Sequence, residues 1–81
     1  MNLSRNIDAP MLIKALHKFG YEYTRQTGSH IRLITQQNGQ HHITIPNHDP
    51  LKIGTLNAIL SEVAQHFDIS KQELIESLFK D

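Results

Sequence analysis

The chain has 81 residues, of which 38% are hydrophobic and 20% charged, and its eight basic residues balance eight acidic ones. This length allows one small domain, over residues 1–81, and the composition excludes a disordered chain. The absence of cysteine excludes disulfides and thiolate metal sites. No apolar run approaches the ~20 residues of a membrane span and no secretory pattern opens the chain, so we expect a cytoplasmic protein without a membrane partner.

The first predicted element is a helix over residues 9–19. Asp8 suits the N-cap position, and Pro10 suits the first turn, where its missing N–H costs little. Gly20 is a typical C-terminal stop. The apolar side of this helix is marked by residues at helical spacing, namely Leu12, Ala15, Leu16 and Phe19.

Three strands follow, over residues 21–27, 31–36 and 41–45, each rich in residue types that favour strands. Alternation in the first strand predicts that Tyr21 and Tyr23 face the core. Because these strands are separated by short turns, we predict an antiparallel sheet.

The turn around Asn38 and Gly39 decides which residues of the second and third strands share a face. A two-residue Asn-Gly turn would split the aliphatic residues between the two faces. A three-residue loop, with Gly39 left-handed in a bulge, pairs Leu33 with Ile43. It also pairs Ile31 with Ile45. We predict the bulged loop, because each buried aliphatic side chain contributes about 1.5–3 kcal/mol, more than a turn preference.

This register predicts a second face of the sheet, directed away from the core. Arg32 lies across from Thr44, and His30 lies one step along at the end of the sheet. His42 is several residues away at ~3.3 Å rise each, too far to contact His30. The residues of this face are His30, Arg32, Ile34, His42 and Thr44.

Residues 46–52 form a predicted loop because prolines interrupt them. A second helix follows with Thr55 as its N-cap and ends at Asp68, and Ser70 with Glu73 forms a capping box for a short third helix. The fold class is therefore α+β, in the order α-β-β-β-α-α, with helices on one face of a small three-stranded antiparallel sheet. The second helix carries the apolar stripe Leu56, Ile59, Leu60, Val63, Ala64 and Phe67.

The candidate functional segment is Gly28-Ser29-His30, between the first two strands. Two small residues leave room for a substrate, and an imidazole transfers protons near neutral pH. The guanidinium groups of Arg25 and Arg32 match phosphate with two donors each. We expect substrate contacts from Gly28, Ser29, Arg25 and Arg32. We also expect one from Lys52, which lies beside a helix N-terminus. Gly28 and Ser29 would hold an oxyanion through their amides or the serine hydroxyl.

These motifs, in their order, resemble the HicA (YcfA-like) family, the toxin half of a bacterial type II toxin–antitoxin pair. The likeness covers about residues 10–70 and rests on GSH, the short hairpin, the IPNH segment and the GTL helix start. It implies a fold akin to double-stranded-RNA-binding domains and an mRNA endonuclease that needs no metal or other cofactor. It further implies that His30 is catalytic, that mRNA is the substrate, and that a cognate HicB-type antitoxin blocks the site.

Two other functions fit the same residues. One is a non-catalytic module of the same fold that binds RNA or a protein. The other is a metal protein that uses His41, His42 and His48, although adjacent residues of a strand point to opposite faces. The charge pattern permits RNA binding, because residues 24–51 carry two arginines and four histidines against the single acid Asp49.

Overall fold

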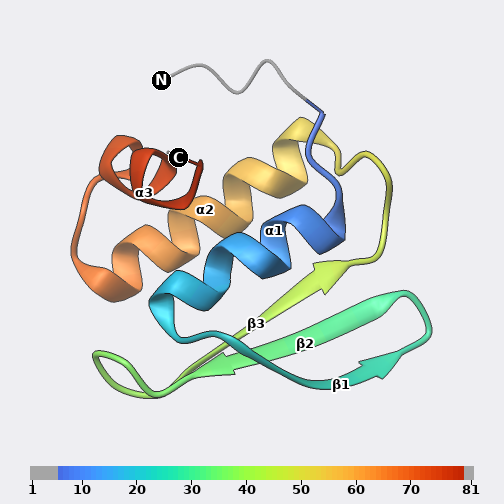
Figure 1. Cartoon of the computed structure of the whole chain (residues 1–81), viewed down its shortest axis with the longest axis horizontal. Coiled ribbons are helices and arrows are strands. Elements are labelled where there is room, and N and C mark those ends of the chain that lie inside the picture. Colours follow the sequence, from blue (N-terminus) through green and yellow to red (C-terminus); the bar gives the residue numbers. More distant parts are fainter. Residues whose placement is uncertain (1–5, 80–81) are drawn as a thin grey trace.

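The computed structural model describes residues 6–79 and has helices on one side of a single sheet (Figure 1). The three strands are antiparallel, in the order β1-β2-β3. Among the described residues, no helix lies over the other side of the sheet (Figure 1). This confirms the predicted α+β fold. The elements are α1 (Ala9–Leu16), the 3-10 turn η1 (His17–Phe19), β1 (Glu22–Thr27), β2 (His30–Thr35), β3 (His41–Pro46), α2 (Ile53–Phe67) and α3 (Lys71–Phe79).

Helix α1 begins and ends as its sequence predicts. The Asp8 carboxylate accepts a hydrogen bond from the Met11 amide at 2.9 Å. The last turn tightens into η1, and Gly20 ends it with a φ of 80°. Glycine is required here on two counts. A side chain would strain the left-handed backbone, and its Cβ would lie 2.8 Å from Thr35 Oγ1.

The register of β2 and β3 is the one that buries four aliphatic residues together. Leu33 pairs with Ile43, and Ile31 pairs with Ile45. All four are buried beneath the helices, which confirms the prediction made from burial. The helices complete this core with Leu12, Leu16, Leu56, Leu60, Val63, Leu74 and Leu78.

The turn between β2 and β3 contains two left-handed residues. Gly39 has a φ of 93°, as the bulged loop predicts, and Asn38 has a φ of 55°. The conformation of Asn38 was not predicted. Asparagine tolerates it better than most residues, and the Asn38 amide donates to the His66 carbonyl of α2 at 2.8 Å. The turn is thereby fixed to the helical layer.

Tyr23 lies on the predicted face of the sheet but is not buried. Its partner in the sheet is Leu33, so it lies on the helix side, yet 58% of its surface is exposed. Strand β1 is the edge strand, and all six of its residues are exposed. The helices do not extend over this edge, so alternation alone does not bury the side chain. Tyr21, just before β1, is fully buried as predicted.

The predicted start of the second helix is wrong. Helix α2 begins at Ile53, with Lys52 as its N-cap, and not after Thr55. The preceding residue, Leu51, is buried and its amide donates to the Ile7 carbonyl at 2.9 Å. Since this contact fixes the chain at Leu51, the helix can start directly after Lys52. Among the described residues, no helix is long and apolar enough to cross a membrane.

We predict that Gly39→Val lowers the thermal stability of the protein. The cost comes from the backbone, because an added Cβ would meet only His66 Cε1, at 4.0 Å, while a β-branched residue tolerates positive φ badly. We expect a loss of about 1–3 kcal/mol in the free energy of unfolding, measured by urea denaturation.

The matched control is Gly54→Ala, inside the first turn of α2, where a Cβ meets nothing within 4 Å. Alanine is the better helix former, so this variant should gain up to about 1 kcal/mol. A Gly39→Val protein as stable as the parent would contradict the left-handed turn.

Candidate functional site

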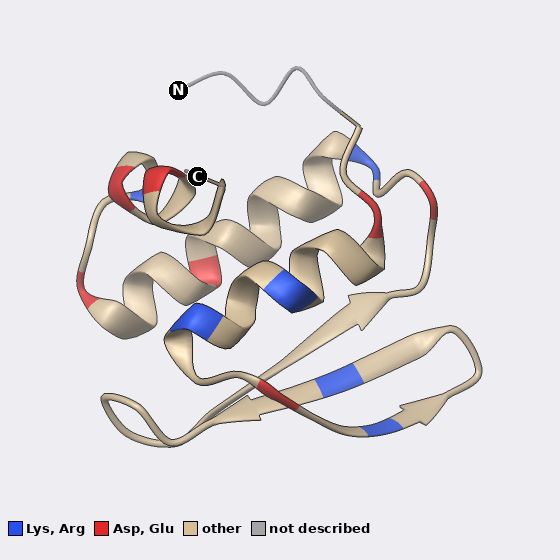
Figure 2. Ribbon diagram, viewed as in Figure 1, with Lys and Arg blue, Asp and Glu red and all other residues tan. Residues whose placement is uncertain are grey.

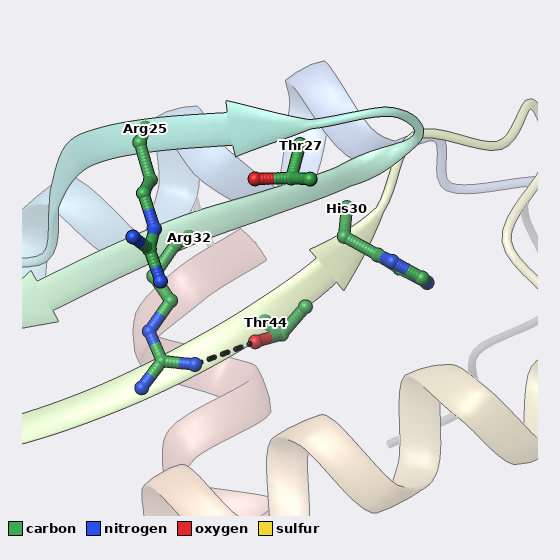
Figure 3. Close-up of a pocket in the computed structure, with 5 residues that line it drawn as sticks. All are labelled: Arg25, Thr27, His30, Arg32 and Thr44. Carbon is green, nitrogen blue, oxygen red and sulfur yellow. Dashed lines mark hydrogen bonds between the residues drawn. The ribbon is translucent and has the colours of Figure 1, made fainter.

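An open hollow of about 380 Å³ lies at one end of the helix-free face of the sheet. Its side chains come from all three strands, so the sheet itself sets their spacing. Figure 3 shows two arginines, two threonines and one histidine around it. We call it the cationic hollow, and it is lined by Arg25, Thr27, His30, Arg32 and Thr44.

A tight turn positions His30 at the start of β2. Thr27 pairs with His30, so only Gly28 and Ser29 lie between the strands. Gly28 has a φ of 58°, and nothing lies within 4 Å of the place of a Cβ, so glycine is needed for the backbone angle alone. A positive φ at the first central residue is typical of a type II′ hairpin turn. The Asn47 amide donates to the Ser29 carbonyl at 2.6 Å and ties the turn to the segment after β3.

His30 is exposed at the rim of the cationic hollow, on the face that the register predicts. Its ring is directed away from the two guanidinium groups (Figure 3). It forms no hydrogen bond with the other residues that the structure describes. Exposed side chains change rotamer in picoseconds to nanoseconds, so both ring nitrogens are accessible to a ligand.

An irregularity in β1 brings Arg25 to the same face. Tyr23 pairs with Leu33 and Arg25 with Arg32, which leaves Thr24 as one extra residue. The Thr24 hydroxyl donates to the Arg32 carbonyl at 3.1 Å. Beyond such a bulge the alternation of side chains is reversed. Arg25 therefore faces the cationic hollow, although it is two residues from the helix-side Tyr23.

The two arginines are direct neighbours across the strands, and like charges in this position destabilise a sheet. Arg32 Nη1 donates to Thr44 Oγ1 at a long 3.4 Å. Within residues 6–79 neither guanidinium has a carboxylate partner, since the only ion pair described there joins His41 and Glu62. Two adjacent, unneutralised guanidinium groups are the arrangement that binds a phosphate or another anion.

A family model described as the HicA toxin of bacterial toxin-antitoxin matches residues 10–64, more than half of the chain. The chain belongs to the HicA toxin family. The match spans the whole sheet and every residue of the cationic hollow. A toxin role and an antitoxin partner follow from this membership. No curated protein and no solved structure matches the chain, so the likeness of this HicA toxin to double-stranded-RNA-binding domains stays a prediction.

Not every predicted site residue of this HicA toxin lines the hollow. Gly28 and Ser29 form the adjacent turn, and Lys52 lies in the helical layer as the N-cap of α2. Their roles in substrate binding stay predictions. Thr27 was not singled out from the sequence. A two-residue Gly-Ser turn would have indicated it, because that turn places Thr27 directly across from His30.

The three histidines of the metal alternative do not converge. His41 faces the helices, where its Nε2 lies 3.1 Å from a Glu62 oxygen. His42 lies on the other face and contacts Gln40 at 2.9 Å, while His48 lies in the loop after β3. Among the described residues, no group of three or more suitable side chains is placed to hold a metal ion. The structure therefore gives this alternative no support.

A chain of polar contacts, with the buried Tyr21 at one end, lies at the opposite end of the sheet of the HicA toxin. The Tyr21 hydroxyl lies 2.6 Å from His41 Nδ1 and forms a hydrogen bond with it, while His41 Nε2 is turned to Glu62. His66 stacks on His41 with ring centroids 4.5 Å apart. His66 Nε2 also lies 3.0 Å from the Gly39 carbonyl, so it donates to the β2–β3 turn. This cluster joins α2 to the sheet.

Burial raises the pKa of the Tyr21 phenol to about 12, and the nearby Glu62 carboxylate adds to the shift. An unfolded tyrosine ionises near pH 10. The stabilisation from this group is therefore fully present below pH 10 and is lost as the pH rises through about 12. Two pKa units correspond to roughly 2–3 kcal/mol in the free energy of unfolding.

We predict that Tyr21→Phe weakens this alkaline loss of stability. At pH 8 the variant should be about 1 kcal/mol less stable than the parent, because the hydrogen bond to His41 is missing. Between pH 10 and 12 the difference should shrink or reverse. Urea denaturation at several pH values measures it, with Tyr23→Phe, at an exposed phenol, as the control. Equal pH profiles for the parent and Tyr21→Phe would contradict the buried phenol.

The fixed charges of the toxin are unevenly distributed (Figure 2). Arg25 and Arg32 lie in the sheet, where the only acid is Glu22. The helices and the segments between them carry both signs, and among the described residues their acids outnumber their lysines. The sheet face is mildly basic although the chain as a whole is neutral.

Proposed function

We propose that this HicA toxin is a metal-independent mRNA endonuclease, with His30 as its catalytic residue. The observation that carries the proposal is the cationic hollow, where one exposed histidine lies beside two arginines that no described carboxylate neutralises. Phosphate is the anion that a paired guanidinium site fits. A ribose hydroxyl beside that phosphate gives the histidine a proton to accept.

The reaction needs few groups. His30 takes the proton of the ribose 2′-hydroxyl, and the 2′-oxygen attacks the adjacent phosphorus. The bond to the 5′-oxygen breaks, this oxygen takes a proton from the solvent, and the products are a 2′,3′-cyclic phosphate and a 5′-hydroxyl end. A positioned base contributes about 10²–10⁴ in rate. Arg25 and Arg32 would stabilise the charge that builds on the phosphate oxygens in the transition state.

The spacing of the hollow suits a ribose and its phosphate. His30 and Arg32 are two residues apart on one face of β2, a separation of about 6–7 Å between their backbones. Rotation about the Cα–Cβ bond of His30 carries its ring toward the arginines. The amides of Gly28 and Ser29 would contact the same phosphate group. Lys52, farther away, would contact a more distant part of the RNA.

The antitoxin partner, we propose, is of the HicB type and covers the open face of the sheet. An inhibitor must prevent RNA from reaching the cationic hollow, and no helix within residues 6–79 lies over this face (Figure 1). Carboxylates of the antitoxin would neutralise Arg25 and Arg32, which are unpaired among the described residues. Because RNA and the antitoxin would contact the same arginines, they would compete for this face.

We predict that His30→Ala abolishes RNA cleavage and growth inhibition without loss of thermal stability, because the side chain is exposed. The measurement is cleavage of RNA by the purified protein in EDTA, with analysis of the product ends. His17→Ala is the matched control, since it removes an exposed histidine from η1, in the helical layer.

Full activity of His30→Ala would disprove its catalytic role. If the parent protein binds RNA in EDTA but never cleaves it, the protein is a binding module instead. Cleavage that disappears on chelation would contradict the metal-independent reaction.

We predict that Arg25→Gln lowers RNA cleavage at least tenfold while the melting temperature stays equal or rises. The variant removes one phosphate contact and also relieves the repulsion from Arg32, an effect of about 0.2–1 kcal/mol. Lys14→Gln, on the exposed side of α1, changes the net charge equally and should leave cleavage unchanged. A variant that loses stability together with activity would indicate a structural role for Arg25.

A further inference from the structure

A second hollow, of about 470 Å³, opens on the same face of the sheet. It shares no residue with the cationic hollow, and it is the part of this face that the proposed reaction does not use. Its chemistry also differs, since no cation lines it. The residues that line this second hollow are Gly20, Glu22, Ile34, Gln36 and Gln37.

The sheet register places the second hollow next to the cationic one. Glu22 pairs with Ile34, and Arg25 pairs with Arg32 one step along the same face. That step is two residues, or about 6–7 Å. The bulge at Thr24 lies between the two pairs, so it separates a stretch of β1 with a carboxylate from a stretch with a guanidinium. A strand of RNA that runs along β2 from a phosphate between the arginines would pass the second hollow.

The wall of the second hollow is held in place by the backbone. The position of a Cβ on Gly20 would lie 2.7 Å from Gln37 Nε2, so the side-chain amide of Gln37 packs against bare glycine backbone. The hydroxyl oxygen of Thr35 accepts a hydrogen bond from the backbone N–H of Gln37 at 3.1 Å and donates one to the Phe19 carbonyl at 2.8 Å. The backbone of Gln37 is thus tied to Thr35, and its side chain lies against Gly20.

The residues that line the second hollow favour a nucleobase over a phosphate group. The Glu22 carboxylate repels phosphate, whereas it accepts hydrogen bonds from the amino group of a base. The amides of Gln36 and Gln37 both donate and accept, and Ile34 offers a half-buried apolar surface to a ring. Within residues 6–79 none of these three polar side chains has a hydrogen bond or ion pair of its own.

We propose that the second hollow binds one nucleobase of the RNA whose phosphate lies in the cationic hollow, and that it favours a base with an exocyclic amino group. Cytosine, adenine and guanine carry this donor, and uracil does not. The preference falls on a nucleotide beside the cleaved linkage, because the two hollows are adjacent and separate. This inference rests on the proposed nuclease function and adds a sequence preference to it.

The test uses short RNAs that are all uridine except for one varied position, scanned along the strand on both sides of the cleavage point. Cleavage by the parent protein is compared for uracil, cytosine, adenine and guanine at each position. At one flanking position we expect the three amino-bearing bases to be cleaved about fivefold or more faster than uracil, the size of one good base contact. Equal rates at every position would overturn the base site and leave the nuclease intact.

The deciding variant is Glu22→Gln, which keeps the size of the side chain and removes the charge. It should reduce the base preference to less than twofold while all-uridine RNA is cleaved as fast as before or faster. Glu76→Gln, on the exposed side of α3, makes the same change in net charge and should keep the full preference. A uniform rise for every RNA in both variants would mean that only the net charge matters, and would overturn the proposal.

The remaining outcomes separate this inference from the function on which it rests. If the parent neither cleaves nor binds any RNA, the nuclease and the base site fall together. If Glu22→Gln keeps the base preference but weakens the antitoxin complex, the second hollow binds the antitoxin and not a base. Binding of the same RNAs to His30→Ala, measured by fluorescence anisotropy, should show the same preference without cleavage, and its absence there would also count against the base site.

Discussion

The extra residue in β1 is the constraint on which both sides of this small sheet depend. Tyr21 and Arg25 are four residues apart, so a regular strand would direct them to the same side. The core needs the phenol of Tyr21 beneath the helices, and the cationic hollow needs Arg25 on the open face. Thr24 resolves the conflict by adding one residue to the strand. Its hydroxyl also bonds to the Arg32 carbonyl, where the ladder is interrupted.

The two sides of the sheet have different roles: one supplies the core, and the other carries the candidate site. On the helix side, buried aliphatic residues of β2 and β3 supply the core, and His41 connects the sheet to α2 through Glu62. On the open side, the side chains pack against little and keep their polar groups accessible. A substitution there creates no cavity, so its cost in stability is small compared with one in the core. This division lets the sheet hold two adjacent arginines despite their repulsion.

Much of the fold was predictable because strong local signals agreed with burial. The Asp8 cap, the Gly20 stop and the capping box of Ser70 with Glu73 are set by their neighbours in sequence, and all three are present. The register of β2 and β3 followed from one comparison, since only one register buries four aliphatic residues together. The start of α2 was missed because Thr55 suits an N-cap, whereas the helix begins after Lys52, next to a backbone contact between Leu51 and the distant Ile7.

The candidate site was predictable where alternation is regular and not where it is broken. His30, Arg32 and Thr44 share a face because β2 and β3 are regular. Arg25 was chosen for its chemistry, yet simple alternation places it on the wrong face. The two-residue Gly-Ser turn contained the missing information, because counting back from Thr27 and His30 sets Arg25 opposite Arg32. The exposure of Tyr23 depends on where the helices end over the sheet, which no pattern within β1 records.

The uneven placement of charge has a consequence for how the toxin meets a large polyanion. Its formal net charge is zero, so it has little overall attraction to RNA from a distance. Among the described residues, the arginines of the open face and the excess of acids in the helical layer nevertheless separate positive from negative charge (Figure 2). The field of a polyanion exerts a torque on such a separation of charge even when the net charge is zero. The toxin would approach with its sheet foremost, and its charges would govern the angle of encounter more than its frequency.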